Sequence, residues 1–283
     1  MVYIGGQGIC VTPVIPMTEL KLRGLGPDCH VLVTAAARGI GRGIAEAFLA
    51  SGCRVHVCDN DRQALSDFQS AHPGAITTDL DVADHQAVDA VFDAIERRGG
   101  HLDVLVNNAG IAGPISPAEG ISPEDWSRTM DVNLSSHFYF ARRAIPILRS
   151  RGGGSMLFIA SSAAFMGCPM RAPYAASKWG LIGLVKTLAM ELGKDAIRVN
   201  ALCPGSVAGP RIEKVMRRDA EAGGIPLERV RQSYLKQSSM RVFMQPEDIA
   251  NMALFLASEL GARISGQAIG LDGHSESFAQ DDP

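Results

Sequence analysis

Residues 30–41, HVLVTAAARGIG, decide the fold of this chain. The first five are apolar or β-branched, as in a buried strand, and glycines at positions 39 and 41 follow where a helical pattern begins. Glycines at a strand-to-helix turn let the backbone approach a phosphate group, which then lies against the unpaired N–H groups of the helix N-terminus. A tight turn without a ligand also uses glycine, so this stretch alone leaves both interpretations open.

Strand-like and helical patterns alternate from this turn to residue 271. Helices are expected to begin after Ser122 and after Gln245, because each is followed by Pro and two acidic residues. The alternation, without repeats or linkers, predicts an α/β fold in one domain, a Rossmann-type doubly wound parallel sheet of about seven strands with helices on both faces. The predicted strands are 30–34, 54–58, 75–78, 102–106, 156–160, 196–202 and 267–271.

The composition excludes several classes of function. The chain has 283 residues, 46% of them hydrophobic, and 27 basic against 30 acidic residues give a net charge of −3. That balance argues against disorder and against a nucleic-acid partner. The six cysteines are scattered without metal-ligand spacing, so we expect no metal site, and free thiols in a reducing cytoplasm.

The two ends of the chain differ from its body. Residues 1–28 are rich in Gly and Pro and are expected to be a poorly structured leader, with Met17 a candidate natural start. This leader lacks a basic segment before an apolar one, and no stretch of the chain is apolar for the roughly 20 residues that a membrane span needs. We therefore expect no membrane partner, a dinucleotide-binding domain over 29–275 and a tail over 276–283.

An acidic residue follows the second predicted strand. Asp59 lies 20 residues after Gly39, where a carboxylate can accept hydrogen bonds from the ribose hydroxyls of a dinucleotide and repel a 2′-phosphate. Arg38 and Arg42 favour the opposite choice, because a guanidinium can pair with that phosphate. We expect NAD, with NADP less favoured, although Asp59 could also be part of a polar turn.

A second group of residues carries proton chemistry. Ser161 follows a strand, and Tyr174 and Lys178 are spaced to share one face of a helix. A phenol with an ordinary pKa of about 10 is a poor base, and a nearby ammonium favours its ionised form. The hydroxyl of Ser161 can hold a substrate oxygen while Tyr174 exchanges the proton. Tyr and Lys four residues apart also occur by chance, so this spacing alone does not prove a site.

Over about residues 28–275 the chain resembles the classical short-chain dehydrogenases/reductases. The resemblance rests on motifs in the family's order: the Gly-rich turn 34–41, NNAG at 107–110, Asn133 in MDVNL, Ser161 with Tyr174 and Lys178 in the S…YxxxK pattern, Pro204-Gly205, and Leu271-Asp272-Gly273. Ser161 fits better than Ser162 because the family places the serine 13 residues before the tyrosine.

The resemblance implies a role for each matching residue. Tyr174 is the general acid/base, Ser161 polarises the reacting oxygen, Lys178 binds the nicotinamide ribose, and Asn133 holds a water in a proton relay to Lys178. The implied cofactor-binding residues are Thr34, Ala36, Arg38, Gly39, Ile40, Gly41, Asp59, Asp81, Val82, Asn108, Ala109, Gly110, Tyr174, Lys178, Pro204, Gly205 and Val207.

Two positions depart from the family pattern. Ala35 replaces the first glycine of the turn, which makes the turn tighter. Gly209 replaces a threonine that would hold the nicotinamide carboxamide, so that contact is in doubt, although backbone groups near Val207 could still serve.

The substrate end is less defined. Segment 206–245 is long for a connection and is expected to be a substrate lid, with eight basic and four acidic residues. Arg211 is a candidate partner for an anionic substrate group, or simply part of a solvated helix, and Ser161, Ala163 and Tyr174 are the other substrate candidates. Phe165, Met166 and Met170 are either a pocket wall, core residues or subunit contacts.

These expectations together describe an NAD-dependent oxidoreductase. It transfers a hydride between NAD and a secondary alcohol or ketone, such as a polyol, a sugar-derived alcohol or a hydroxy acid. The alternatives are an NADP-dependent carbonyl reductase and a catalytically idle dinucleotide-binding regulatory protein. The resemblance also implies a homo-oligomer, a tetramer or dimer, for which 137–140 on a helix are possible contacts.

Overall fold

The computed structural model describes residues 22, 24–97 and 100–275, which form a seven-stranded parallel sheet in the order β3-β2-β1-β4-β5-β6-β7. The predicted fold class is therefore confirmed. Strand ends move by one or two residues from the predicted ones, and β5, for example, begins at a glycine that interrupts the apolar pattern. The strands are β1 His30–Thr34, β2 Arg54–Asp59, β3 Ile76–Asp79, β4 Val104–Asn107, β5 Gly154–Ile159, β6 Ile197–Pro204 and β7 Ala268–Leu271.

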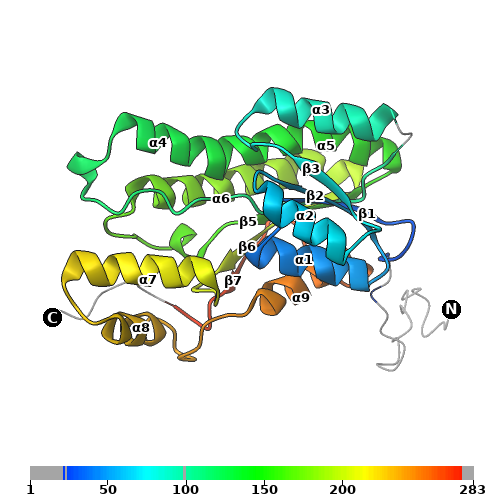
Figure 1. Cartoon of the computed structure of the whole chain (residues 1–283). Helices are drawn as coiled ribbons and strands as arrows, with labels where there is room; N and C mark the ends of the chain where they lie inside the picture. Colours follow the sequence, from blue (N-terminus) through cyan, green and yellow to red (C-terminus); the bar gives the residue numbers. More distant parts are fainter. Residues whose placement is uncertain (1–21, 23, 98–99, 276–283) are drawn as a thin grey trace, which may run out of the picture.

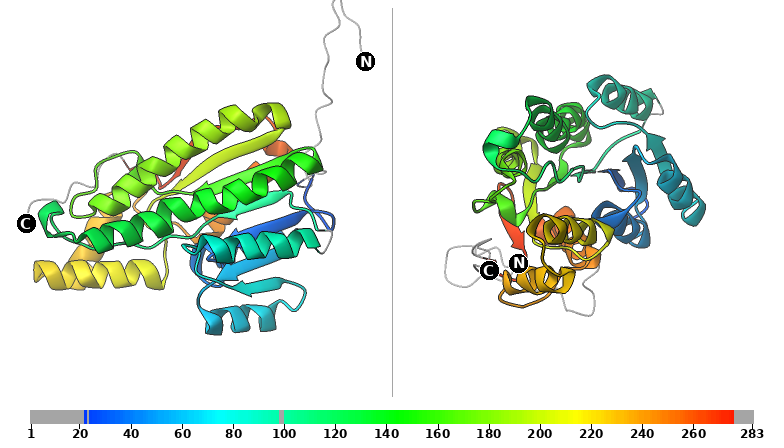
Figure 2. Two further views of the ribbon diagram at one scale, coloured as in Figure 1. Left: turned by 90° about the horizontal axis from the view of Figure 1, so that it is seen from above. Right: turned by 60° about the vertical axis from the view of Figure 1, so that its left-hand side comes forward.

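Two layers of helices enclose the sheet (Figures 1 and 2). One face is covered by α1 Gly39–Ala50, α2 Arg62–Ala71 and α9 Pro246–Ala257. The other face is covered by α3 His85–Arg97, α5 Ser136–Arg151 and α6 Ala172–Leu192. Helix α4 Pro123–Met130 leads into α5, and α7 Pro210–Gly223 and α8 Leu227–Lys236 lie beyond the strand ends.

Successive residues of the central strands bury their side chains in different layers. Val31 and Val33 of β1 pack with α1 and α9, whereas Leu32 packs with α3 and α5 on the opposite face. This alternation explains the nearly continuous apolar runs in the sequence, because a parallel sheet covered on both faces has no solvent side.

The helix starts follow the predicted capping chemistry. The Ser122 hydroxyl accepts a hydrogen bond from the Asp125 N–H at 3.0 Å, and Gln245 forms a capping box with Asp248 at the start of α9. Of the expected leader, residues 1–21 and 23 lie outside the described part. Leu22 and Leu25 pack against the core, and the Cys29 N–H donates to the Gly26 carbonyl at 2.9 Å.

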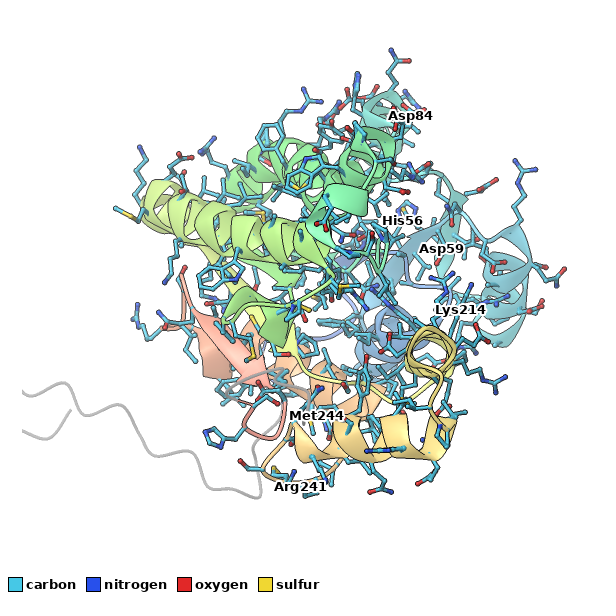
Figure 3. The ribbon with its side chains drawn as sticks, turned by 90° about the vertical axis from the view of Figure 1, so that its left-hand side faces the viewer. His56, Asp59, Asp84, Lys214, Arg241 and Met244 are labelled. Carbon is cyan, nitrogen blue, oxygen red and sulfur yellow. The ribbon has the colours of Figure 1, made fainter. Side chains whose placement is uncertain are left out.

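The carboxyl ends of the strands meet at one edge, the left-hand side of Figure 1. The strand order reverses between β1 and β4. From β1 the chain continues to β2 and β3 on one side, and β4 to β7 follow on the other side. Ligands of open parallel sheets bind at such switch points. In Figure 3, which looks toward this edge, Asp59 lies at the end of β2 and Lys214 lies on α7, on the same side of the molecule.

The β1–α1 turn is tied directly to the end of β4. The Thr34 hydroxyl oxygen accepts hydrogen bonds from the Asn108 and Ala109 N–H groups at 2.9 and 3.1 Å. The Asn108 amide donates in return to the carbonyls of Thr34 and Ala35 at 2.9 and 2.8 Å. Ala35, which replaces the family's glycine, adopts a left-handed backbone (φ 50°) that favours glycine, so this turn tolerates some strain.

No helix of the described residues is long and apolar enough to cross a membrane. Within the same part of the chain, no group of three or more His, Cys, Asp or Glu side chains is placed to hold a metal ion.

Gly41 is predicted to be essential for this packing. A Cβ at this position would lie 2.4 Å from the Asn108 amide nitrogen and 2.6 Å from the Ala35 carbonyl oxygen. Gly41→Ala should therefore lower the melting temperature and weaken dinucleotide binding. The control variant is Gly183→Ala, at an exposed position of helix α6 where a Cβ would meet no atom within 4 Å. Its free energy of unfolding should rise by about 0.5–1 kcal/mol. Equal melting temperatures for the two variants would contradict this account.

Candidate active site

Helix α6 carries the predicted tyrosine and lysine near its N-terminal end. Lys178 is only 3% exposed, and its ammonium donates a hydrogen bond to the Ile159 carbonyl oxygen at 3.0 Å. Its Nζ lies 5.8 Å from the ring centroid of Tyr174, which is half-buried. The predicted pair therefore comes together at the carboxyl end of β5.

Burial is the main influence on this amine. Desolvation, together with the smaller effect of the positive charge of Arg211, lowers the pKa of Lys178 to about 7, although the neighbouring Cys203 opposes the shift. An amine with this pKa can gain or lose a proton near neutral pH, as a relay requires.

Gly110 separates Lys178 from Asn133. A Cβ on Gly110 would stand 3.4 Å from the Lys178 Nζ and 3.5 Å from the Asn133 Oδ1. Both polar atoms therefore face the backbone of the NNAG segment, and the absence of a side chain there keeps the space beside the amine open.

Asn133 lies in a π-helical turn, Asp131–Ser135, between α4 and α5. Its Oδ1 accepts from the Ile111 N–H at 2.7 Å, and its amide donates to the Ile111 carbonyl at 3.0 Å and to the Ser177 hydroxyl at 3.2 Å. Single π-helical turns often occur at functional sites. Asn133 thus fixes the segment after β4 against α6.

The two serines after β5 differ in exposure. Ser162 is 2% exposed, whereas Ser161 is half-buried and its oxygen accepts from the Ala163 N–H at 3.2 Å. The Ser161 hydroxyl can still donate, so the geometry agrees with the preference for Ser161. The Ala163 side chain is buried, so only its backbone is placed to act at the site.

A second cation, Arg171, also lies beside Tyr174, and the sequence motifs did not single it out. The guanidinium carbon of Arg171 lies 5.3 Å from the Tyr174 ring centroid. Arg171 and Lys178 thus place two cations beside one phenol. Ser177 is the other residue missed at this position, and its hydroxyl donates to the Tyr174 carbonyl at 2.7 Å.

The start of α1 fits a dinucleotide. This helix has no side-chain cap and no acidic residue in its first turn, so its terminal N–H groups are available to a pyrophosphate. A Cβ on Gly39 would meet no atom within 4 Å, which shows that space remains above the turn. Arg38 pairs with Asp61 at 3.0 Å.

Asp59 ends β2 with its carboxylate turned toward the glycine-rich turn. One oxygen accepts from the Ala37 N–H at 3.0 Å and the other from the Asp61 N–H at 3.1 Å. The polar-turn role and ribose binding are compatible, because each carboxylate oxygen accepts more than one hydrogen bond.

The remaining predicted cofactor residues line the same strand ends. The Asp81 carboxylate pairs with Arg128 at 3.0 Å and accepts from the Ala83 N–H, while Val82 is buried beside it. Three more lie at or just after the end of β6: Pro204 is its last residue, Gly205 donates to the Leu271 carbonyl at 3.0 Å, and Val207 bridges to Met244. Thr34, Ala36 and Ala109 are buried, and Ile40 is half-buried against the α1 layer.

The segment 206–245 folds into helices α7 and α8 with a small core of their own around Met216, Ala220 and Val230. Arg231 of α8 donates to both oxygens of Glu213 on α7, at 2.6 and 2.7 Å. Gly209 before α7 has φ 138°, a backbone that favours glycine and that a threonine would adopt only with strain.

Arg211, at the start of α7, donates to the Gly110 carbonyl at 3.2 Å. It is exposed and reaches across the strand ends toward the NNAG segment. It therefore lies on the Lys178 side of the site.

The other candidates divide by exposure. Phe165 and Met170 are 42% and 46% exposed, so neither is a core residue of the chain, and Met166 is half-buried. On α5, His137 and Phe140 are buried and Phe138 is exposed. His137 has its pKa lowered to about 3 by burial, with Lys178 adding to the shift, and its Nε2 contacts the Ala109 carbonyl oxygen at 2.8 Å.

A family model, curated relatives and solved structures that are similar to this chain all point to the same protein family. A family model described as enoyl-(acyl carrier protein) reductase matches residues 34–273. D-beta-hydroxybutyrate dehydrogenase of Rhizobium meliloti is 33% identical over 255 residues, covering 86% of this chain and 96% of that protein. Galactitol 2-dehydrogenase of Agrobacterium fabrum is 35% identical over 244 residues, covering 86% and 95%. The solved structure of an actinorhodin polyketide ketoreductase variant with NADPH is 30% identical, with a TM-score of 0.82 and coverage of 87% and 96%.

The chain belongs to the classical short-chain dehydrogenases/reductases. It is an oxidoreductase of secondary alcohols or ketones in small molecules, and its family implies a nicotinamide dinucleotide cofactor.

Burial of Lys178 predicts a pH-dependent stability difference. The folded-state pKa is lower than that of the unfolded chain, so unfolding takes up protons and the cost of burying the amine is fully present below about pH 7. That cost fades as the pH rises toward the ordinary lysine pKa. The free energy of unfolding of Lys178→Met should therefore exceed that of the wild type by several kcal/mol at pH 6. This difference in unfolding free energy should narrow by pH 10.

The matched control is Lys186→Met, on the exposed side of the same helix. It should show no such gap in denaturant titrations at the two pH values. A Lys178→Met gap that stays constant from pH 6 to pH 10 would mean that the amine is not desolvated.

Proposed function

We propose that the protein is an NAD-dependent dehydrogenase that interconverts a secondary alcohol and a ketone through Ser161, Tyr174, Lys178 and Asn133. The observation that carries this proposal is the buried Lys178 amine beside the Tyr174 ring at the carboxyl edge of the sheet. When bound, the nicotinamide accepts or supplies the hydride. The chain's own residues orient the substrate and move the proton.

In this proposal Ser161 donates a hydrogen bond to the reacting oxygen, and the ionised Tyr174 oxygen accepts the proton from the alcohol and becomes the neutral phenol. Lys178 would then relay the proton to the water held by Asn133, because Ile159 fixes the position of its amine and its pKa is about 7. Asn133 would hold a water next to the amine, beside the open space at Gly110. The four side chains come from three segments of the chain, and Asn133 joins its own segment to α6 through Ser177 and to the segment after β4 through Ile111.

The cofactor preference is proposed from the charges at the nucleotide end. Asp59 would bind the adenosine ribose and repel a 2′-phosphate. Arg38, the residue that argued for NADP, already pairs with Asp61, and Arg42 already pairs with Glu46 at 2.8 Å. An NADP-dependent carbonyl reductase is the second candidate, favoured by the NADPH named with the similar ketoreductase structure.

Substrate binding is proposed to involve Ser161, Tyr174, the Ala163 backbone and Arg211, with α7 and α8 as the lid. We also propose a cytoplasmic homo-oligomer, supported by the free thiols of the described cysteines and by exposed Phe138 and Trp179 on neighbouring helices α5 and α6. Light scattering of the purified protein tests the assembly, and a monomer would contradict it.

Tyr174→Phe should reduce turnover by about 10²- to 10⁴-fold, because it removes the group that exchanges the proton. The affinity for NAD should change little, since only one hydroxyl is lost. Absorbance of the reduced nicotinamide measures turnover, and fluorescence titration measures binding. Tyr139→Phe on α5 is the matched control and should keep full activity; wild-type turnover in Tyr174→Phe would refute the assignment and favour the idle regulatory protein.

Asp59→Asn should lower the ratio of kcat/KM for NAD to kcat/KM for NADP by about 10-fold or more, because it removes the charge that repels a 2′-phosphate. The asparagine keeps a hydrogen-bond acceptor for the Ala37 N–H, whereas Asp59→Ala loses this acceptor as well as the charge. The exposed Asp67→Asn serves as control for net charge. If steady-state kinetics give the same cofactor ratio for Asp59→Asn and wild type, Asp59 does not select the cofactor.

A further inference from the structure

Arg171 is unusual among the cations near the site because its guanidinium forms no hydrogen bond or ion pair with any residue in the described part of the chain. It immediately precedes α6, and its guanidinium lies against the Tyr174 ring at 5.3 Å. Its Nε is buried and has no hydrogen-bond partner among the described residues. A buried donor without a partner costs free energy, so such a group is expected to meet an acceptor from outside the chain.

The nearby carboxylate does not fill that role. Asp219 of α7 lies close enough to act on the same Cys168 thiol as Arg171, and it accepts a 2.5 Å hydrogen bond from the Tyr234 hydroxyl. Within the described part of the chain, Arg171 forms no ion pair. Helix α6 adds no negative charge, since its first turn contains no acidic residue.

Arg211 is placed differently. Its guanidinium donates to the Gly110 carbonyl and acts electrostatically on Lys178, so it belongs to the NNAG side of the site. Arg171 lies instead on the loop that runs from Ser161 to Tyr174, beside α7 and α8. A molecule held by Ser161 and Tyr174 would therefore meet Arg171 with the part that extends away from the reacting carbon.

We propose that Arg171 binds the carboxylate of the substrate, and that the substrate class is short hydroxy acids and their oxo acids rather than neutral polyols. This inference rests on the proposed function and adds the substrate class to it. Guanidinium groups pair with carboxylates through two parallel hydrogen bonds, and a half-buried guanidinium does so with little competition from water. The two similar dehydrogenases are named for one substrate of each kind, hydroxybutyrate and galactitol.

The test compares a hydroxy acid with its amide, which has the same carbon skeleton without the charge. Initial rates with D-3-hydroxybutyrate and D-3-hydroxybutyramide, and with galactitol as the neutral polyol, give kcat/KM for the wild type and three variants. Arg171→Met removes the charge, Arg171→Lys keeps it without the paired donors, and Arg218→Met removes an exposed charge from α7 as the matched control.

We expect the wild type to prefer the acid over the amide by about 100-fold, the usual effect of a desolvated charge pair. Arg171→Met should abolish that preference, mainly through KM, because kcat/KM for the acid falls about 100-fold more than kcat/KM for the amide. Arg171→Lys should retain part of the preference, and Arg218→Met all of it.

The proposal is overturned if the wild type oxidises galactitol or the amide as well as the acid, or if Arg171→Met loses activity equally on acid and amide. The latter result would indicate a structural role, such as pairing with Asp219. Absence of turnover on every alcohol would instead contradict the proposed function. In that case thermal shifts with butanoate and NAD decide the inference: stabilisation of the wild type but not of Arg171→Met supports it, and equal shifts or none overturn it.

Discussion

The site depends on one buried amine. Lys178 enters the protein interior next to Tyr174, and the Ile159 carbonyl at the end of β5 is the acceptor that holds it there. Removing an ammonium from water is expensive, and in this chain the cost appears as a pKa lowered to about 7. The same amine faces Gly110, where any side chain would occupy the space beside it. The sheet, the NNAG segment and α6 must therefore pack as they do for the amine to reach the phenol.

The fold and the placement of Tyr174 and Lys178 beside each other on one helix could be predicted because their signals are local. Apolar runs define β1 and β4, capping residues define α4 and α9, and the spacing of Tyr174 and Lys178 depends only on the helix period. The ends of the strands were less predictable. Asn107 is polar and Pro204 is a proline, so neither is typical of a strand, but each belongs to a strand because it pairs with a neighbouring one. The segment 206–245, expected to be a lid or a pair of solvated helices, forms helices α7 and α8, and the apolar contacts of these helices lie mainly within the pair itself.

The residues that escaped prediction act through contacts between distant segments. His137 looked like a candidate for a subunit contact, yet it is buried against the Ala109 carbonyl, 28 positions earlier in the chain. Arg38 suggested NADP, and its pairing with Asp61 is a contact that the sequence did not predict. Gly209 replaces a threonine of the family pattern, and its φ of 138° is a backbone that favours glycine. Arg171 carries no family signal, and only its unpartnered nitrogen and its position over Tyr174 draw attention to it.

The charges of the site divide by function. At the nucleotide end Asp59 is acidic and the nearby arginines are paired, which favours an unphosphorylated ribose. At the proposed substrate end Arg171 is cationic and forms no ion pair among the described residues, which favours an anion. In our proposal the site therefore disfavours an added phosphate on the ribose and favours a carboxylate on the substrate.

The most direct measurement follows deuterium from the carbinol carbon of hydroxy acids and polyols, with NAD and NADP supplied in parallel. The account predicts that mass spectrometry finds the label on the reduced dinucleotide, with NAD the better acceptor. Reduced dinucleotide that lacks the label, or none with any alcohol and either cofactor, would contradict hydride transfer at this site.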